Sequence, residues 1–91
     1  MSGQPLDEFL NAVIVLDSRA PYVYIGTLES YDDMFVTLKD ASVHDCAESP
    51  ITREQHVAEV RRFGLRVSRK YVKIKFSDIV GISRLDDVVV D

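Results

Sequence analysis

The sequence predicts a mainly β protein in which an N-terminal helix precedes a strongly bent, five-stranded antiparallel barrel. Short apolar segments rich in β-branched residues recur along the chain, and turn-forming residues separate them. One of these segments contains Gly26. Because a glycine inside a strand often marks a sharp bend, we expect Gly26 to let its strand curl, so that the sheet closes or nearly closes on itself.

The length of 91 residues indicates a single domain, 1–91, with a modest core. Open strand edges on so small a domain gain from pairing with another subunit, so we expect an oligomer. The longest apolar runs are far shorter than the roughly 20 residues of a membrane span, and residues 1–7 lack a secretory signal. We therefore expect no membrane partner and a cytoplasmic location, with which the single cysteine, Cys46, agrees.

The N-terminal elements follow from apolar spacing. Leu6, Phe9, Leu10 and Val13 recur at helical intervals and predict a short helix from about Pro5 to Asn11. Strands are expected at 13–16, 22–30 and 34–38, with connections at 17–21 and 31–33.

Residues 44–70 interrupt this β pattern as an insertion. Loop-forming residues fill 44–52, and Thr52 stands three residues before Gln55, which is the spacing of a capping box. A helix is expected from there to a C-cap at Gly64. Alternating apolar residues then predict a fourth strand from Leu65 to Phe76, a turn at 77–78 and a fifth strand from Ile79 to Leu85, after which 86–91 either extend the strand or fray.

Charge is segregated along the chain. The net charge of −4 argues against a protein that coats nucleic acid with its whole surface. Residues 53–75, however, hold eight basic residues against two acidic ones, a net charge of +6, with Phe63 and Tyr71 among them. This composition is typical of a surface that contacts RNA, of a solvated helix face, and of a surface that offsets acidic residues of a neighbouring subunit. RNA contact on this surface would involve Arg61, Arg62, Arg66, Arg69 and Lys70.

Two segments resemble the motifs of the Sm-like (LSm/Hfq) superfamily. Residues 26–41, GTLESYDDMFVTLKDA, are similar to the first Sm motif, in the register of the bacterial Hfq branch or, with a shorter turn, of the archaeal and eukaryotic branch. Residues 74–82, IKFSDIVGI, are similar to the second motif, with Lys75 in place of its Arg and Phe76 in place of its Gly. The chain thus resembles a divergent Sm-like protein with an enlarged loop between the third and fourth strands.

The resemblance implies a homo-oligomeric ring of six or seven subunits, in which the fourth strand of one subunit pairs with the fifth of the next. It also implies single-stranded RNA at the pore, in an RNA chaperone or ribonucleoprotein scaffold. Asp32 would brace the turn, Met34 or Phe35 would stack on a base, and Lys75 would meet a phosphate. The pore residues implied are Asp32, Asp33, Met34, Phe35, Lys75 and Phe76.

This chain departs from the family pattern in ways that favour a second hypothesis. The Asn that hydrogen-bonds the base in the family is absent, and Phe76 stands where the family has the glycine that lets RNA pass closely. The alternative is a structural or protein-interaction ring that has lost RNA recognition.

Catalytic and metal-binding patterns are weak. His44, Cys46 and His56 match no compact zinc spacing. Asp32-Asp33 and Asp86-Asp87 are adjacent pairs, whose side chains point to opposite faces of a strand. The sequence shows neither a glycine-rich phosphate loop nor a nucleophile elbow, so we expect no enzyme activity, cofactor or metal.

Overall fold

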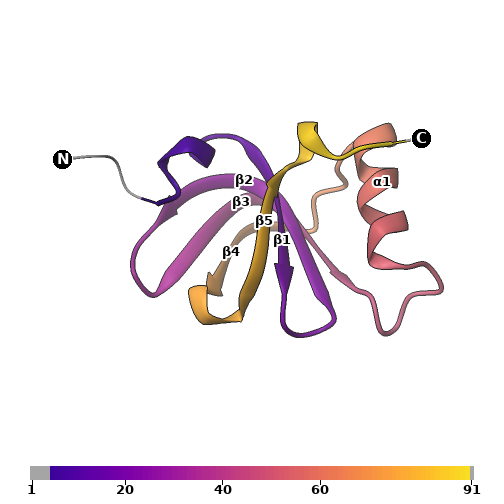
Figure 1. Ribbon diagram of the computed structural model, residues 1–91, viewed down its shortest axis with the longest axis horizontal. Helices are drawn as coiled ribbons and strands as arrows, with labels where there is room; N and C mark the ends of the chain where they lie inside the picture. Colours follow the sequence, from indigo (N-terminus) through magenta and orange to yellow (C-terminus); the bar gives the residue numbers. More distant parts are fainter. Residues whose placement is uncertain (1–4, 91) are drawn as a thin grey trace.

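Five antiparallel strands form one strongly bent sheet in the computed structural model, which describes residues 5–90 (Figure 1). The order across the sheet is β4-β3-β2-β1-β5. The strands are β1 (Val13–Ser18), β2 (Tyr22–Tyr31), β3 (Phe35–Asp45), β4 (Arg69–Lys75) and β5 (Ile79–Arg84). The helical elements are α1 (Arg53–Phe63) and three single 3₁₀ turns, η1 (Asp7–Phe9), η2 (Phe76–Asp78) and η3 (Leu85–Asp87).

The barrel is open on one side. β4 pairs only with β3 and β5 only with β1 among the described residues, so the sheet does not close within one chain. Both end strands therefore carry a row of backbone groups without a partner strand, which is the arrangement that favours β-pairing with another copy.

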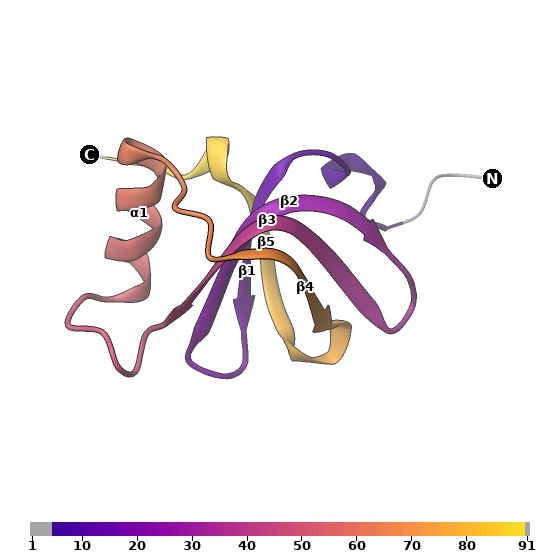
Figure 2. The same ribbon diagram turned by 180° about the vertical axis from the view of Figure 1, so that it is seen from behind.

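β2 and β3 bend together (Figure 2), and Gly26 lies within β2 at an irregularity of their pairing. The pairing shifts register between Ile25 and Thr27, and Asp40 on the opposing strand has a positive φ of 49°. A Cβ on Gly26 would lie 2.8 Å from the Cβ of Ala41. The predicted bend at Gly26 thus coincides with a β-bulge, and the close approach of β3 leaves no room for a side chain.

The predicted N-terminal helix is shorter than expected. Only η1, Asp7–Phe9, is helical, and the helix from Pro5 to Asn11 does not form. The backbone N–H of Asn11 donates to the Leu28 carbonyl, and the N–H of Leu28 donates to the Ala12 carbonyl. Because residues 11 and 12 hydrogen-bond to β2, they are withdrawn from the helix.

Strand limits also differ from the prediction. β3 continues to Asp45, well past Leu38, because its second half pairs with Tyr22–Ile25 of β2. β4 begins at Arg69 rather than Leu65, since the half-buried Leu65 packs against the core cluster under α1 instead of alternating in a strand. Phe76 falls in η2, outside β4.

Two apolar clusters form the core. The larger lies inside the bent sheet and includes Ile14, Leu16, Leu28 and Leu38, all fully buried. The second lies under α1, where Val57 and Val60 pack on residues that include Val15, Val23 and Ile25. The capping box expected at Thr52 and Gln55 is present, and Gly64 caps the C-terminus. The insertion therefore contains a helix that its apolar face holds to the sheet.

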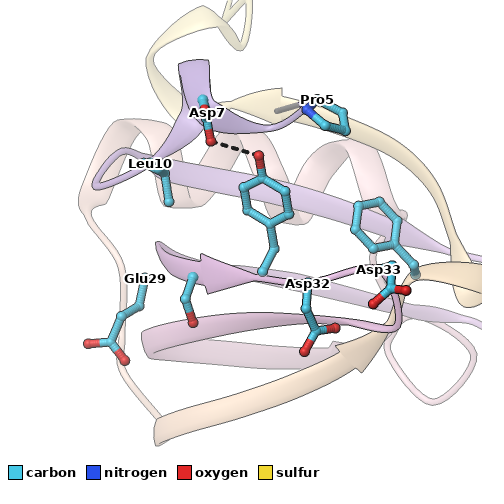
Figure 3. Close-up of a pocket in the computed structure, with 9 residues that line it drawn as sticks. Pro5, Asp7, Leu10, Glu29, Asp32 and Asp33 are labelled. Atoms are coloured by element: carbon cyan, nitrogen blue, oxygen red, sulfur yellow. Dashed lines mark hydrogen bonds between the residues drawn. The ribbon is translucent and has the colours of Figure 1, made fainter. Parts of the chain in front are cut away.

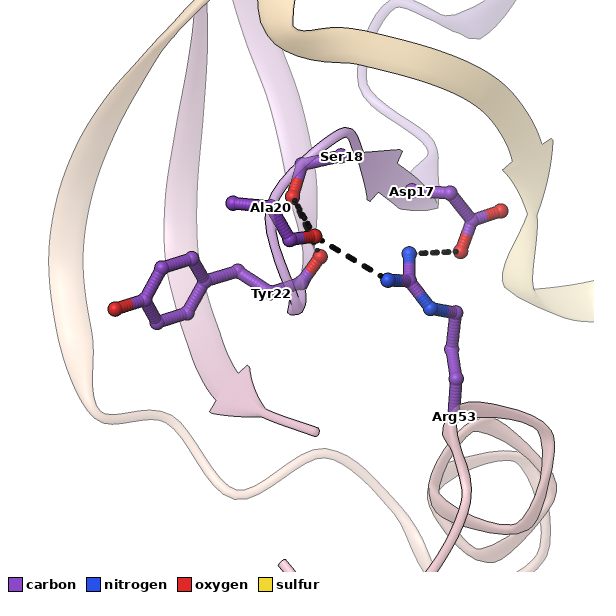
Figure 4. Close-up of polar contacts among 5 residues, drawn as sticks. All are labelled: Asp17, Ser18, Ala20, Tyr22 and Arg53. Atoms are coloured by element: carbon purple, nitrogen blue, oxygen red, sulfur yellow. Dashed lines mark hydrogen bonds and ion pairs between the residues drawn. The ribbon is translucent and has the colours of Figure 1, made fainter. Parts of the chain in front are cut away.

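Arg53 ties the start of α1 to the β1–β2 connection (Figure 4). Its Nη1 lies 3.3 Å from Oδ1 of Asp17, and its Nη2 donates to the Ala20 carbonyl at 3.3 Å. The buried Ser18 hydroxyl shares its proton between the carbonyl oxygens of Ala20 and Tyr22, at 2.9 and 2.8 Å. This network fixes the turn against which the helix docks.

Within residues 5–90, no helix combines the length and apolarity needed to cross a membrane.

Candidate nucleic-acid interface

The turn between β2 and β3 is organised by Asp32. Its Oδ1 accepts hydrogen bonds from the backbone N–H groups of Met34 and Phe35, at 2.8 and 2.7 Å. Its own N–H donates to the Phe35 carbonyl at 2.9 Å. These N–H donors favour the charged carboxylate and hold the pKa of Asp32 below its ordinary value. Asp32 therefore has the bracing role that the sequence predicted, and the turn presents Met34, which is 61% exposed.

The end of β4 lies beside this turn. Lys75 pairs in register with Phe35, and the N–H of Phe76 donates to the Met34 carbonyl at 2.9 Å. Lys73 Nζ lies 5.8 Å from the centre of the Phe35 ring, which is a cation–π distance. The structure thus brings the six predicted pore residues to one end of the sheet. It adds Lys73, which sequence reasoning did not place in the site.

Phe76 is engaged inside the fold. Its half-buried ring meets Tyr31 edge to face, with centroids 6.5 Å apart, and packs against the larger core cluster. Phe76 therefore helps to pack the core at this end of the sheet, whereas Met34 is the more exposed side chain.

An acidic pocket of about 650 Å³ opens next to the turn (Figure 3). Tyr31 crosses it, donating its hydroxyl proton to Asp7 at 2.7 Å and accepting from the N–H of Leu6 at 3.2 Å. Desolvation, together with the bond to Asp7, raises the pKa of Tyr31. The lining residues are Pro5, Asp7, Leu10, Glu29, Ser30, Tyr31, Asp32, Asp33 and Phe76. Four carboxylates and no basic side chain line the pocket, so its field opposes a phosphate.

The acidic pocket was not predicted from the sequence. Its acidic residues come from the N-terminal segment and from the β2–β3 turn, which the folded chain brings together through the bond between Asp7 and Tyr31. The adjacent acidic pair Asp32-Asp33 was the only local signal.

The predicted basic residues are divided between α1 and the sheet. Arg61 and Arg62 occupy the last turn of α1, Arg66 follows it, and Arg69 and Lys70 begin β4. All five are exposed. Figure 1 shows α1 and the β2–β3 turn at opposite ends of the long axis, which measures 44 Å. The arginines of the α1 end are therefore separate from the predicted pore residues, whereas Arg69 and Lys70 lie on the strand that ends at Lys75.

The histidines set apart in the sequence meet in the structure. His44 of β3 and His56 of α1 stack with ring centroids 3.8 Å apart and planes 7° apart. Cys46 is a half-buried free thiol that packs on the core cluster under α1.

Known structures resemble the chain in fold. No family model and no curated protein matches it. A solved structure of the Sm protein of Pyrococcus abyssii in complex with a uridine heptamer matches 90% of this chain and 99% of its own, at 20% identity and a TM-score of 0.59. A chain in the crystal structure of the NatC complex bound to CoA matches 96% of this chain and 91% of its own, at 15% identity and a TM-score of 0.59. With its order of β4-β3-β2-β1-β5 and its bent β2 and β3, the chain has the Sm-like fold.

Proposed function

We propose that this chain assembles into a closed ring of six or seven copies that binds single-stranded RNA. The observation that carries the assembly is the pair of open edges, β4 and β5, on an otherwise fully paired sheet. Tyr71 on β4 and Val80 on β5 are 51% and 61% exposed. Pairing β4 of one copy with β5 of the next would cover both side chains and satisfy the backbone groups of both edges.

The RNA part of the proposal rests on basic side chains at both ends of the molecule. Lys73 and Lys75 lie beside Phe35, the residue after the exposed Met34 of the β2–β3 turn. At the other end, Arg66 lines one pocket together with Phe63, which is 82% exposed, and Arg61 lies in the same last turn of α1. Arginines interleaved with an exposed aromatic suit a strand of phosphates and bases. The Sm protein of similar fold is described in complex with a uridine heptamer, which supports the same class of ligand here.

The role proposed is binding and assembly without catalysis, in the cytoplasm, as an RNA chaperone or a ribonucleoprotein scaffold. This assignment rests on the analogy of fold and on the side chains at the two surfaces.

Light scattering of the purified protein tests the assembly. A mass of six or seven times 10.3 kDa supports the ring, and a monomer contradicts it. Val80→Lys places a charge on the open edge of β5 and should reduce the mass to that of the monomer while the circular dichroism spectrum is retained. Val89→Lys is the matched control, since Val89 is 86% exposed and lies beyond the strand.

Oligo-U and oligo-A RNA, added at low and at physiological salt, test the ligand. A mass increase that weakens with salt supports RNA binding, because affinity that depends on phosphate contacts falls as salt rises. An unchanged ring mass with either RNA contradicts it.

The second candidate function is a protein-interaction ring. The acidic pocket favours it, because four carboxylates beside the turn oppose a phosphate and suit a basic protein segment. The similar chain from the NatC complex belongs to a protein assembly. A ring that leaves RNA unbound and captures a basic peptide, lost in Asp33→Asn, would support this candidate.

A further inference from the structure

A second pocket, of about 400 Å³, lies between β3 and α1. We call it the insertion pocket, because most of its lining comes from the segment between β3 and β4. It belongs to the α1 end of the molecule, away from the acidic pocket (Figure 1). Its lining residues are Ser42, His44, Ile51, His56, Glu59, Val60, Phe63, Gly64 and Arg66.

Three buried polar atoms of this pocket lack hydrogen-bond partners. They are Oγ of Ser42, Nε2 of His44 and Nε2 of His56. Within residues 5–90, these are the buried side-chain nitrogen and oxygen atoms found without a partner. Ser42 is itself only 9% exposed. Because buried polar groups in folded proteins are almost always hydrogen-bonded, these three atoms give the wall of one pocket hydrogen-bonding capacity that the chain itself does not satisfy.

The stacking of the histidines argues against a shared metal ion as that ligand. An imidazole nitrogen binds a metal through a lone pair that lies in the ring plane. The two planes are 7° from parallel and their centroids are 3.8 Å apart, so their lone pairs do not converge on one point.

The charge of the pocket favours a neutral occupant. Burial and the neighbouring His44 lower the pKa of His56, while Glu59 opposes this shift. The imidazole of His56 is therefore neutral at neutral pH, and the Glu59 carboxylate further disfavours an anion. The neutral imidazole of His56 and the hydroxyl of Ser42 offer both donors and acceptors, as does the edge of a nucleobase.

The mouth of the pocket suits the rest of a nucleotide. Phe63 lines it and is 82% exposed, which leaves an aromatic surface open for stacking. Arg66 lines the same mouth and is exposed, so a phosphate outside the pocket can reach its guanidinium.

We propose that the insertion pocket binds one nucleobase of single-stranded RNA, stacked on Phe63, hydrogen-bonded by Ser42, His44 and His56, and followed by a phosphate at Arg66. This inference rests on the proposed RNA function and names a site for it on α1, separate from the β2–β3 turn.

The histidine content makes the test selective. The chain contains two histidines, and both line the pocket. The imidazole rings are labelled with ¹³C, and the protein is titrated with adenosine, uridine, cytidine or guanosine 5′-monophosphate. The NMR signals of both histidines should shift and then reach a plateau as the nucleotide concentration rises. A decamer of the preferred base should shift the same signals at lower concentration.

Two variants separate the pocket from general charge. Ser42→Ala and Phe63→Ala should each weaken nucleotide binding by about tenfold, through a lost hydrogen bond and a lost stacking surface. Ser68→Ala, at an exposed position between α1 and β4, is the matched control and should bind as the parent does. Folding is not at risk, because Ser42→Ala removes a hydroxyl without a partner and Phe63 is mostly exposed.

The outcomes distinguish this inference from the proposed function. If RNA binds while both histidine signals stay in place, the pocket proposal is overturned and the RNA-binding function stands. If neither nucleotides nor RNA shift any histidine signal or change the mass, the nucleobase site and the RNA-binding function are both overturned. A pocket that binds a protein partner would give this result. If inorganic phosphate alone reproduces the shifts, the pocket is an anion site and the nucleobase proposal is overturned.

Discussion

His44 of β3 and His56 of α1 lie face to face, 3.8 Å apart, and so join the insertion helix to the sheet. The contact predicts a loss of stability in mild acid. The folded pKa of His56 is lowered from 6.5 by burial and by His44, so its contribution to stability is complete above pH 6.5. As the pH falls through 6.5, the unfolded chain takes up a proton that the folded chain does not, and stability declines.

Urea unfolding measured from about pH 7.5 to about pH 5.5 checks this expectation. The transition midpoint should fall over this range in the parent protein and change less in His56→Gln, which carries no titrating ring. An equal decline in both proteins would place the sensitivity elsewhere.

Gly26→Ala should destabilise the fold by about 1–3 kcal/mol, because the added Cβ would lie 2.8 Å from the Cβ of Ala41 and 2.9 Å from its Cα. Chemical denaturation measures the change. Gly81→Ala is the control, since its Cβ would meet only the Asp17 side chain, at 3.3 and 3.8 Å. Adding Ala41→Gly to Gly26→Ala should recover part of the loss, and no recovery would contradict the clash as its cause.

Asp32→Ala should lower the melting temperature, because the backbone N–H groups of Met34 and Phe35 lose their acceptor. Asp32→Asn should have a smaller effect, since the amide oxygen still accepts. Asp33→Ala is the matched control, because Asp33 is an exposed neighbour and the acceptor of these two hydrogen bonds is Asp32. Differential scanning calorimetry separates the three variants, and equal melting temperatures for the two alanine variants would exclude the bracing role.

Arg66→Ala should weaken RNA binding and reduce the slope of log affinity against log salt by about 0.7, the value for one lost phosphate contact on a single strand. Lys75→Ala tests the β2–β3 turn in the same way. Lys39→Ala, which removes an exposed base outside both surfaces, should leave the slope unchanged. Fluorescence anisotropy with labelled oligo-U and oligo-A at several salt concentrations gives these slopes, and an unchanged slope removes the residue from the interface.

Local sequence patterns predicted most of the fold. Alternating apolar residues indicated five strands, the spacing of Thr52 and Gln55 indicated the start of α1, and Gly26 marked the bend. The limits of elements were less predictable because tertiary pairing sets them. Asn11 leaves the helix to bond Leu28, a partner that no local pattern reveals.

The candidate sites divide in the same way. The β2–β3 turn is local, so one motif contained Asp32 and the backbone groups it holds. The insertion pocket is made when α1 docks on β1 and β2 through Val57 and Val60, which brings His56 to His44 of β3. Along the chain, the spacing of His44, Cys46 and His56 matches no zinc site, so no local pattern indicated that the two histidines meet. Their stacking follows from the docking of α1.

The open edges of the sheet have a further consequence, because they belong to two different strands. A copy that adds by pairing β4 with β5 makes a head-to-tail contact, and each new copy again exposes one free β4 and one free β5. Such a contact yields a closed ring when the rotation between copies divides a full turn, and an endless filament when it does not. The angle between the two edges depends on the bend at Gly26 and the bulge at Asp40. In the proposed assembly, a single glycine in the middle of β2 thus contributes to the angle on which the choice between particles of fixed size and fibres depends.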